Sequence, residues 1–491
     1  MPDSAIAVRV GGGLRRRDVE GQAGSTACPS HLGFALLVVL VILLVVGGSS
    51  ASFIWFMNQQ QARAGARYRA AAAVAVAEAG VHRALSILES TAPDGARGRA
   101  WRPVTYTEGL PVGPLDGRFT LSLTNEASGA ILITSAGEVG GVVRRLRAWV
   151  YLASPALLAA LHGESFVRLE SQPAATFIVP YGAGIGDRPW VHIAAGRGIW
   201  FATTDVSINE PSLAFNAGPG PLDGPGGAHT AITAPRPGPV RLLLGRGAEL
   251  TLGQDPLRVD VQQLRTMGVY VDGDVVRTEA LARPPEVDRA FYGAQASANT
   301  GNAGLNEAAG RYLGDRDLIR KRDSLYTPRE FEQVQTYLRA GLRPPRFRGV
   351  IYVTGRVSLL ERQRLQIADG ALIAESTVQI QQGASLEVTH SAATRTLPGV
   401  IVLDHGALVV AQEGRLRVHG LVYVSRVIDV GEGAHIDIVG SVLGNDPGLS
   451  FRSFGATVII RYDSAVLGTP GLLVAGDAPV VAWVAAWEEL P

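Results

Sequence analysis

The sequence has very little cysteine and lysine, and the scarcity of cysteine narrows the choice of protein class. Cys28 is the only cysteine among 491 residues, so a disulfide scaffold is excluded, and a thiol-free head outside the cytoplasm fits the composition. Lys321 is the only lysine, and arginine supplies the remaining cationic side chains. The formal net charge of +1 argues against a nucleic-acid partner bound by bulk electrostatics.

Aromatic residues are also scarce, at 7% of the chain, whereas aliphatic residues are plentiful. The 59 glycines follow no collagen-like period, so they indicate turns between many short β-strands. A chain of this length exceeds one ordinary domain, and we expect two or three soluble units.

One long apolar run marks the N-terminal part of the chain. No charged residue occurs between Glu20 and Arg63. As a helix, residues 34–57 would extend about 36 Å, which exceeds the roughly 30 Å of bilayer hydrocarbon. The sequence therefore predicts a membrane-spanning helix here.

The Ala-rich segment that follows, residues 59–90, can continue the same helix into water. Its apolar residues recur every three or four positions, which predicts one narrow buried stripe. We expect the helix to end near Ser90, before the turn signal Pro93-Asp94-Gly95. The predicted stripe consists of Ala70, Val74, Ala77, Val81, Leu85 and Leu88.

The basic, unstructured N-terminus leaves three interpretations of the apolar run open. It can follow a prepilin-type leader, it can be a signal peptide cleaved near Ser49-Ser50-Ala51, or it can be an uncleaved anchor. Arginines flank both ends of the run, so the orientation signal is weak.

Three short motifs, in this order and spacing, resemble those of PilX-type minor pilins over about residues 30–152. Gly33-Phe34 before the apolar run resembles the prepilin peptidase site, at which cleavage follows the glycine. The segment Ala77-Glu78-Ala79-Gly80 resembles the family's AEAG signature. Residues 133–145, ITSAGEVGGVVRR, resemble its ITSxG…R segment.

The resemblance implies processing between Gly33 and Phe34 and partnership with other pilin-like subunits through the N-terminal helix. It also implies a single pass through the cytoplasmic membrane, with the head outside the cytoplasm or on a surface filament. Two departures matter: the leader of 33 residues is long, and Val38 replaces the Glu found at the fifth mature position of major pilins. This favours a minor subunit.

Two residues of the helix are candidates for packing against neighbouring helices. Glu78 is either a solvated helix carboxylate or a contact to neighbouring pilin helices. Gly80 in mid-helix costs about 1 kcal/mol relative to alanine, which close helix packing would justify.

The remaining sequence predicts a small antiparallel sheet and then a β-solenoid. Three alternating strands are expected, at 118–124, 130–134 and 142–152. Farther on, a glycine followed by an aliphatic strand recurs roughly every twenty to thirty residues, as in the stacked rungs of a parallel β-solenoid. These glycines are Gly349, Gly370, Gly399, Gly420 and Gly440.

The predicted fold class is α+β, with a long transmembrane and amphipathic helix, a small antiparallel sheet and a mainly β head. Tyr292 to Asn306 is expected to be a polar linker, and Thr327-Pro328-Arg329-Glu330 a capping box that begins a helix. The predicted segments are 1–33 leader, 34–92 helix, 93–153 small sheet, 154–305 irregular rungs, 306–348 helical insertion, 349–467 solenoid core and 468–491 C-terminal segment.

Because β-solenoids host polysaccharide-cleaving enzymes, the acidic and histidine residues were weighed as sites. They lack a spacing that would stack them into one cluster, and no nucleophile elbow, phosphate loop or Cys/His ligand pair occurs. We therefore expect no catalytic, cofactor or metal site. The residues weighed are Asp272, Asp274, Asp404, His405, His419, His435, Asp429, Glu432 and Asp437, with Ser135 and Ser171 isolated.

The sequence thus favours a membrane-anchored minor-pilin-like component of a type IV pilus or related secretion machine, not an enzyme, whose head serves assembly or adhesion. Its expected partners are pilin-like subunits, the cytoplasmic membrane and a surface ligand or polysaccharide, with no nucleic acid. The rival hypotheses are a surface-anchored carbohydrate-active enzyme and an envelope adhesin or scaffold unrelated to pili.

Overall fold

The architecture is described from a computed structural model of the chain. It falls into two compact units, residues 1–69 and 70–491. The predicted leader up to residue 29 lies outside the described residues. The described residues are 30–90, 98, 100–112, 115–126, 129–172, 175–180, 191–195, 197–201, 206–208, 240–244, 249–252, 257–258, 263, 270–271, 273–277, 282–340, 346–445, 448–454, 456–474 and 480–490.

Helix α1 (Ser30–Glu89) contains the whole apolar run, and it ends one residue before the expected Ser90. Two of the three hydroxyl groups within the run bond to the helix backbone: Ser49 Oγ donates to the Val45 carbonyl (2.7 Å) and Ser52 Oγ to the Gly48 carbonyl (2.8 Å). The side chains of the run are therefore mainly apolar, and its helical backbone groups are hydrogen-bonded within the helix. A segment in the hydrocarbon of a membrane needs both properties.

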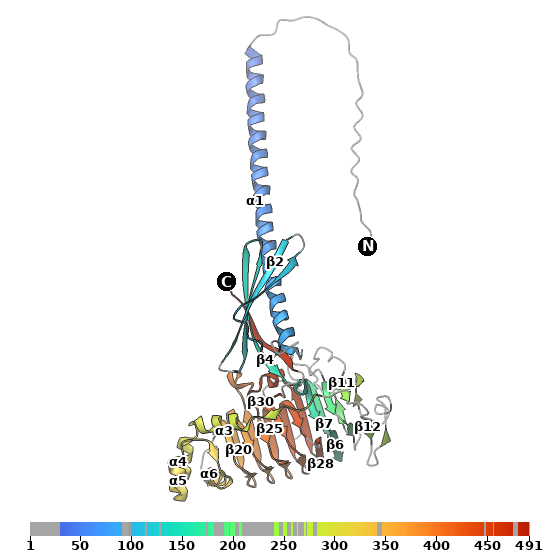
Figure 1. Ribbon diagram of the computed structural model, residues 1–491, viewed down its shortest axis with the longest axis vertical. Helices are drawn as coiled ribbons and strands as arrows, with labels where there is room; N and C mark the ends of the chain where they lie inside the picture. Colours follow the sequence, from blue (N-terminus) through green and yellow to red (C-terminus); the bar gives the residue numbers. More distant parts are fainter. Residues whose placement is uncertain are drawn as a thin grey trace. The chain divides into compact units, whose positions relative to one another are not determined.

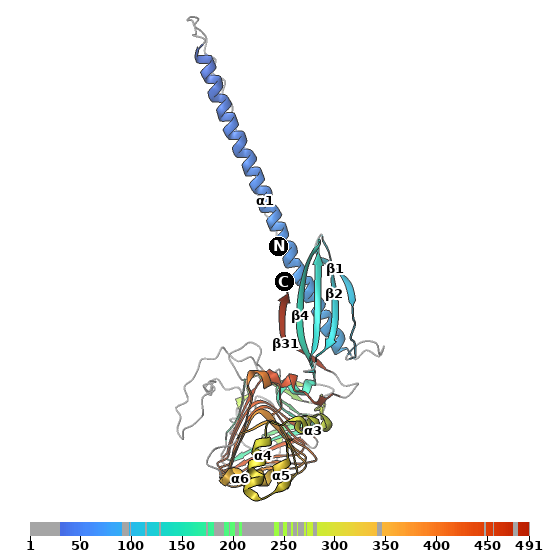
Figure 2. The same ribbon diagram turned by 90° about the vertical axis from the view of Figure 1, so that its left-hand side faces the viewer.

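In the second unit, the C-terminal part of α1 lies on one face of an antiparallel sheet. Among the described residues this sheet has five strands in the order β1-β2-β3-β4-β31. Alternation along β3 is complete, with every second side chain buried, so one face of the sheet is a core face. Figure 2 shows α1 and these strands. Their bounds are β1 Tyr106–Val112, β2 Leu115–Asn125, β3 Ile131–Val139, β4 Val142–Ala153 and β31 Val481–Leu490.

Three of these strands are those the sequence predicts, and β1 and β31 are additions. The C-terminal strand β31 pairs antiparallel with β4, from Val481 opposite Ala153 to Leu490 opposite Arg145. The predicted C-terminal segment therefore returns to the small sheet. Sequence pattern alone could not show this pairing, because it joins residues more than 300 positions apart.

Between β4 and β31 the chain builds a parallel-strand region, defined here as strands β5–β15 and β17–β29. Its pairs are parallel except for β12 with β13. The bounds are β5 Ala159–Gly163, β6 Phe166–Gln172, β7 Ala175–Pro180, β8 Val191–Ala195, β9 Gly198–Phe201, β10 Val206–Ile208, β11 Val240–Leu244, β12 Glu249–Leu252, β13 Leu257–Arg258, β14 Tyr270–Val271, β15 Gly273–Arg277, β17 Leu325–Tyr326, β18 Arg346–Val353, β19 Val357–Leu359, β20 Arg364–Ala374, β21 Val378–Ile380, β22 Ser385–Thr389, β23 Val400–Val402, β24 Leu408–Val410, β25 Arg415–Val424, β26 Ile428–Val430, β27 His435–Gly444, β28 Gly448–Phe454 and β29 Thr457–Tyr462.

The chain passes repeatedly through two sheets of this region. From residue 346 onward, β18, β20, β22, β23, β25, β27 and β29 belong to the larger sheet, and β19, β21, β24, β26 and β28 to the smaller. Figure 1 shows these strands side by side. The prediction of parallel strands between 349 and 467 is confirmed, and the β-solenoid itself stays a prediction.

The earlier strands extend the same two sheets. β5 pairs with β27, β6 with β28 and β7 with β29. The chain therefore enters in the middle of the stack and builds outward to β15. Afterwards it returns to the opposite end at β17 and builds back to the middle.

Three of the recurring glycines, Gly370, Gly420 and Gly440, lie where a long strand changes from one pairing partner to another. Strand β20 pairs with β22 through residue 368 and with β23 from residue 372, and Gly370 lies between. A Cβ on Gly370 would lie 2.0 Å from the Gly349 carbonyl oxygen, and one on Gly440 would lie 2.0 Å from that of Gly420. Successive turns of chain approach too closely at this bend for any side chain, which explains the repeat.

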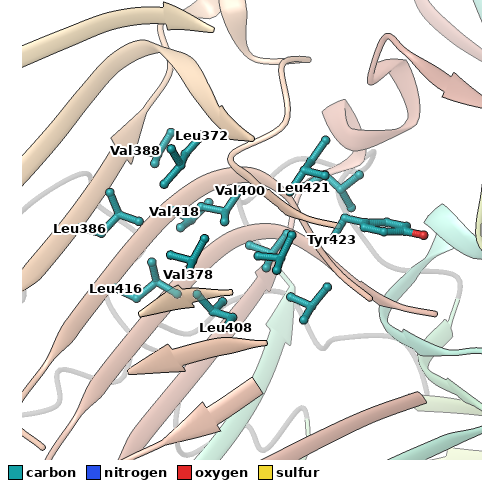
Figure 3. Packing of buried hydrophobic residues seen from close by; sticks show 14 of the residues in the cluster. Leu372, Val378, Leu386, Val388, Val400, Leu408, Leu416, Val418, Leu421 and Tyr423 are labelled. Carbon is teal, nitrogen blue, oxygen red and sulfur yellow. The ribbon is translucent and has the colours of Figure 1, made fainter. Parts of the chain in front are cut away.

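The core of the region is aliphatic and contributed by both sheets. Leu386 and Leu416 are register partners in the larger sheet, Leu408 lies in the smaller one, and all three are buried. Figure 3 shows these side chains packed together. Because each strand is short, stacking of successive strands supplies the buried area.

Four helices lie within residues 289–340, all of which the structure describes. They are α3 Arg289–Ala298, α4 Ala303–Leu313, α5 Arg316–Arg320 and α6 Pro328–Ala340. The capping box forms as predicted: Thr327 N donates to Glu330 Oε2 (2.7 Å) and Glu330 N to Thr327 Oγ1 (3.3 Å). Phe331, Val334 and Leu338 are buried as expected.

The expected linker at 292–306 is wrong, because α3 and the start of α4 lie there. Asp288 caps α3 by accepting from Phe291 N (2.9 Å). The asparagines that indicated a linker are instead fixed to strand β18: Asn299 Nδ2 donates to the Arg348 carbonyl (2.7 Å), and Asn302 Oδ1 accepts from Arg348 N (3.0 Å). Short polar side chains here satisfy backbone groups, a use that composition does not distinguish from a loop.

Short elements complete the fold. Strands β16 (Glu286–Val287) and β30 (Leu472–Leu473) pair antiparallel. Among the described residues, the 3-10 helices are η1 Pro155–Leu158, η3 Ala392–Thr394 and η4 Ser464–Gly468. Gly468 approaches Trp483 of β31, whose ring lies 5.8 Å from that of Tyr151 on β4. This contact joins the parallel-strand region to the small sheet.

Candidate functional site: the helix and the sheet beneath it

The helix and the sheet approach most closely at a seam formed by Ala73, Ala77 and Gly80 of α1 with Ser135 and Gly137 of β3. Ser135 Oγ donates to the Ala77 carbonyl (2.7 Å), and both residues are fully buried. A Cβ on Gly137 would lie 2.2 Å from the Ala73 carbonyl oxygen. A Cβ on Gly80 would lie 2.4 Å from Ser135 Oγ. Only small residues permit this approach.

The two family-like motifs therefore meet each other. The AEAG segment supplies Ala77 and Gly80, and the ITSxG segment supplies Ser135 and Gly137. The arginine end of the second motif lies in β4, where Arg144 Nη1 is 3.9 Å from Glu489 Oε1 of β31. These motif residues serve packing within the chain.

The seam also corrects the predicted stripe. Ala77, Val81 and Leu88 are buried as expected, whereas Ala70, Val74 and Leu85 are only partly buried. The buried face turns toward the small residues, because these let the helix backbone reach the sheet. The helix residues buried in this core are Ala72, Ala73, Val76, Ala77, Val81, Ala84, Ile87 and Leu88.

Gly80 and Glu78 differ in their burial: Gly80 faces the sheet and is buried, whereas Glu78 is partly exposed to solvent. Gly80 is buried against Ser135, Phe119 and Leu121 of its own sheet, so its close packing lies within the chain and not between helices of neighbouring subunits. Glu78 is half-buried, and among the described residues no hydrogen bond or ion pair fixes its carboxylate. His82, one turn later, is exposed.

Gly33 and Phe34 both lie within α1. The Phe34 side chain is 72% exposed, and every large apolar side chain from Leu36 to Met57 is exposed as well. Within the described residues, one helix is long and apolar enough to cross a membrane, judged by length and composition alone. A continuous apolar surface of this size calls for lipid or for other helices as its surroundings.

Two of the acidic residues named from the sequence, Asp404 and Asp437, are paired with arginines. Asp404 forms a two-point hydrogen-bonded pair with Arg289 of α3. Asp437 of β27 is buried and paired with Arg461 of β29. Asp272 lies outside the described residues, and Asp274 falls in β15. Such pairing favours a structural role for Asp404 and Asp437.

Burial sets the direction of the pKa shift for several histidines of the parallel-strand region. Burial is the largest cause of the lowered pKa of His419 and of His435; neighbouring arginines lower each pKa further, and Asp437 partly opposes them. His162, which the sequence did not single out, is buried at the junction of β27, β5 and β8; burial lowers its pKa to about 4. Among the described residues no group of three or more His, Cys, Asp or Glu is placed to hold a metal ion.

No family model matches the chain, and no curated protein matches it. A solved structure that it is similar to is the crystal structure of competence-associated pilin ComZ from Thermus thermophilus. The two share 13% sequence identity, and the alignment covers 86% of this chain and 97% of that chain at a TM-score of 0.22. A likeness at this score carries no argument about fold or function.

Proposed function

We propose that this chain is a membrane-anchored, minor-pilin-like component of a type IV pilus or a related secretion machine. One observation carries the proposal: a single helix combines an exposed apolar run at 34–57 with a C-terminal part packed on a small antiparallel sheet. The first part is suited to lipid, and the second holds a soluble head on the same helix.

The outward face of α1 is the proposed contact to neighbouring pilin-like helices. Ala71, Ala75 and His82 are exposed on this face, and Glu78 is half-buried without a fixed partner among the described residues. Small side chains let another helix approach, and a carboxylate in that contact would select a cationic partner. Gly80 supports this arrangement only indirectly, by fixing the sheet on the opposite side of the helix.

The finer PilX-type assignment belongs to this proposal, as does cleavage between Gly33 and Phe34. Both rest on motif resemblance. The position of Val38 in an apolar, exposed stretch favours a minor subunit, because the Glu expected of an abundant fibre subunit is absent from the sequence there.

The parallel-strand region is the proposed β-solenoid head, displayed outside the cytoplasmic membrane for assembly or adhesion. Repeated passage through two sheets of mainly parallel strands supports a solenoid, since successive passes add parallel strands to both sheets. We further propose that the head binds and does not catalyse. The pairing of Asp404 with Arg289 and of Asp437 with Arg461 supports this, because paired carboxylates are poor general bases.

Charge reversal at the outward helix face tests the assembly role. Glu78→Arg should lower surface piliation or secretion, measured as filament yield from cells that express the full-length protein at normal levels. Glu126→Arg is the matched control, since Glu126 is exposed in the loop after β2. Equal yields for both variants would remove Glu78 from the contact.

Unchanged piliation and secretion in a full deletion strain would contradict the pilus assignment. Polysaccharide cleavage by the purified protein would contradict a non-catalytic head.

A further inference from the structure

One outer surface of the parallel-strand region carries an unbalanced set of arginines. The arginine face is defined here as the outward side chains of Arg346, Arg348, Arg364, Arg415 and Arg417, on strands β18, β20 and β25. The intervening residues Phe347, Leu365 and Leu416 are buried, so alternation along each strand directs these arginines outward.

Strand register aligns these side chains in rows across the strands. Arg364 is the register partner of Ser385, and Ser385 is the partner of Arg415. A second row joins Arg346, Gln366, Glu387 and Arg417 in the same way. Neighbouring strands lie about 4.8 Å apart, so Arg364 and Arg415 are separated by about 10 Å along their row.

Most of the positive charge on this face is not neutralised. Arg346, Arg348, Arg364 and Arg415 are exposed, and none has a carboxylate partner among the described residues. Arg417 is 3.8 Å from Glu387, and its register partner on the next strand, Asp437, is paired with Arg461. The turns beside the face add Glu361, Glu413, Glu432 and Arg362, and the four unpaired arginines still leave an excess of positive charge on a chain whose net charge is only +1.

Hydrogen bonds hold part of the face in place. Arg346 Nε donates to Gln366 Oε1 (3.0 Å), and Gln366 Nε2 donates to Glu387 Oε2 (2.8 Å). A guanidinium held in this way loses less conformational entropy when it binds an anion. The rows contain no aromatic side chain among their described members, so the face lacks the stacking platforms typical of single-stranded nucleic-acid sites.

We propose that the arginine face binds a linear anionic polysaccharide of the polyuronate class, laid across the strands. Guanidinium groups bind carboxylates through two parallel hydrogen bonds, and regular rows suit a polymer whose carboxylates recur regularly. This inference deepens the proposed function by naming a ligand class for the head. It rests on the proposed function in one respect, namely that the head is displayed outside the cell.

Binding of polygalacturonate to the full-length protein in detergent micelles tests the proposal. The paired substitution Arg364→Gln with Arg415→Gln should weaken binding about tenfold or more, since it removes two charge-assisted contacts. The matched control pair is Arg316→Gln with Arg320→Gln, which removes two exposed arginines from α5. Dextran, an uncharged polysaccharide, should not bind.

Several outcomes would overturn the proposal: no binding of polygalacturonate by the unmodified protein, equal weakening by both pairs, or equal binding of dextran. Binding of double-stranded DNA through Arg364 and Arg415, without binding of polygalacturonate, would assign a different ligand class and also overturn it. Filament entry of each variant separates the two claims. Polysaccharide binding by a protein that never enters filaments would sink the pilus assignment alone, whereas normal assembly with undiminished binding by the paired variant would sink this inference alone.

Discussion

Ser135 on strand β3 donates a 2.7 Å hydrogen bond to the carbonyl of Ala77 on helix α1, and both residues are fully buried. The bond joins two sequence segments, at 77–80 and 133–137, that look like separate family signatures. Their joint presence has a physical reason: small residues on both elements let the helix lie close to the sheet, and the hydroxyl satisfies a carbonyl there.

The first prediction concerns Gly137. A Cβ there would lie 2.2 Å from the Ala73 carbonyl oxygen, so Gly137→Ala should push the helix off the sheet and lower the free energy of unfolding by about 1–3 kcal/mol. Chemical denaturation of the full-length protein in detergent measures this. Gly109→Ala is the control, since a Cβ at Gly109 meets no atom within 4 Å. A Gly137→Ala protein as stable as the control would show that the seam is loose.

The second prediction concerns the bend glycines of the parallel-strand region. Gly370→Ala places a methyl group 2.0 Å from the Gly349 carbonyl oxygen, which rigid backbone cannot accommodate without separating successive strands. We expect a loss of about 1–3 kcal/mol of stability, read from thermal unfolding monitored by far-UV circular dichroism. Gly304→Ala in α4 is the matched control, because the space around it is open. Equal melting temperatures would refute the close approach.

The third prediction is a pH dependence set by His162. Burial lowers its folded-state pKa to about 4, against 6.5 for the ordinary side chain. Between these two pKa values the unfolded chain binds more protons than the folded chain does. The contribution of neutral His162 to the free energy of unfolding is therefore fully present above pH 6.5. It falls by about 3 kcal/mol as the pH drops toward 4.

His162→Leu should flatten this part of the pH profile, measured by chemical denaturation at pH 7, 5.5 and 4.5. His390, His419 and His435, whose pKa values burial also lowers, keep a residual slope of the same sign. His82→Leu, on the exposed face of α1, is the control. An unchanged slope in His162→Leu would mean that His162 becomes hydrated on acidification.

The sequence predicts the local elements of this fold well and the long-range pairings poorly. The end of α1 and the capping box at Thr327 and Glu330 follow from local signals, and the structure contains both. The pairing of Val481 with Ala153, and of β5 with β27, joins residues that are distant in the chain and share no local pattern. From the sequence, Gly80 is expected to pack against a neighbouring helix. A glycine in mid-helix indicates that another element approaches closely, but the sequence does not show which element this is.

The fourth prediction follows from that distant pairing. Because Ala153 and Val481 are direct register partners, residues 154–480 can be replaced by a two-residue Asn-Gly turn without moving β4 or β31. The shortened protein should keep slow hydrogen exchange at the amides of β4. A chain truncated after Ala153 lacks β31 and should lose that protection. Equal exchange in the two proteins would show that β31 is dispensable to the sheet.

The N-terminus of the mature protein tests the central proposal most directly. Sequencing of the full-length protein extracted from cell membranes should give a chain that begins at Phe34, with the apolar run of α1 retained. A chain that begins at Ser52 would contradict the account, because the membrane-spanning part of α1 would then be absent from the mature protein. A chain that retains its entire N-terminal segment would also contradict it.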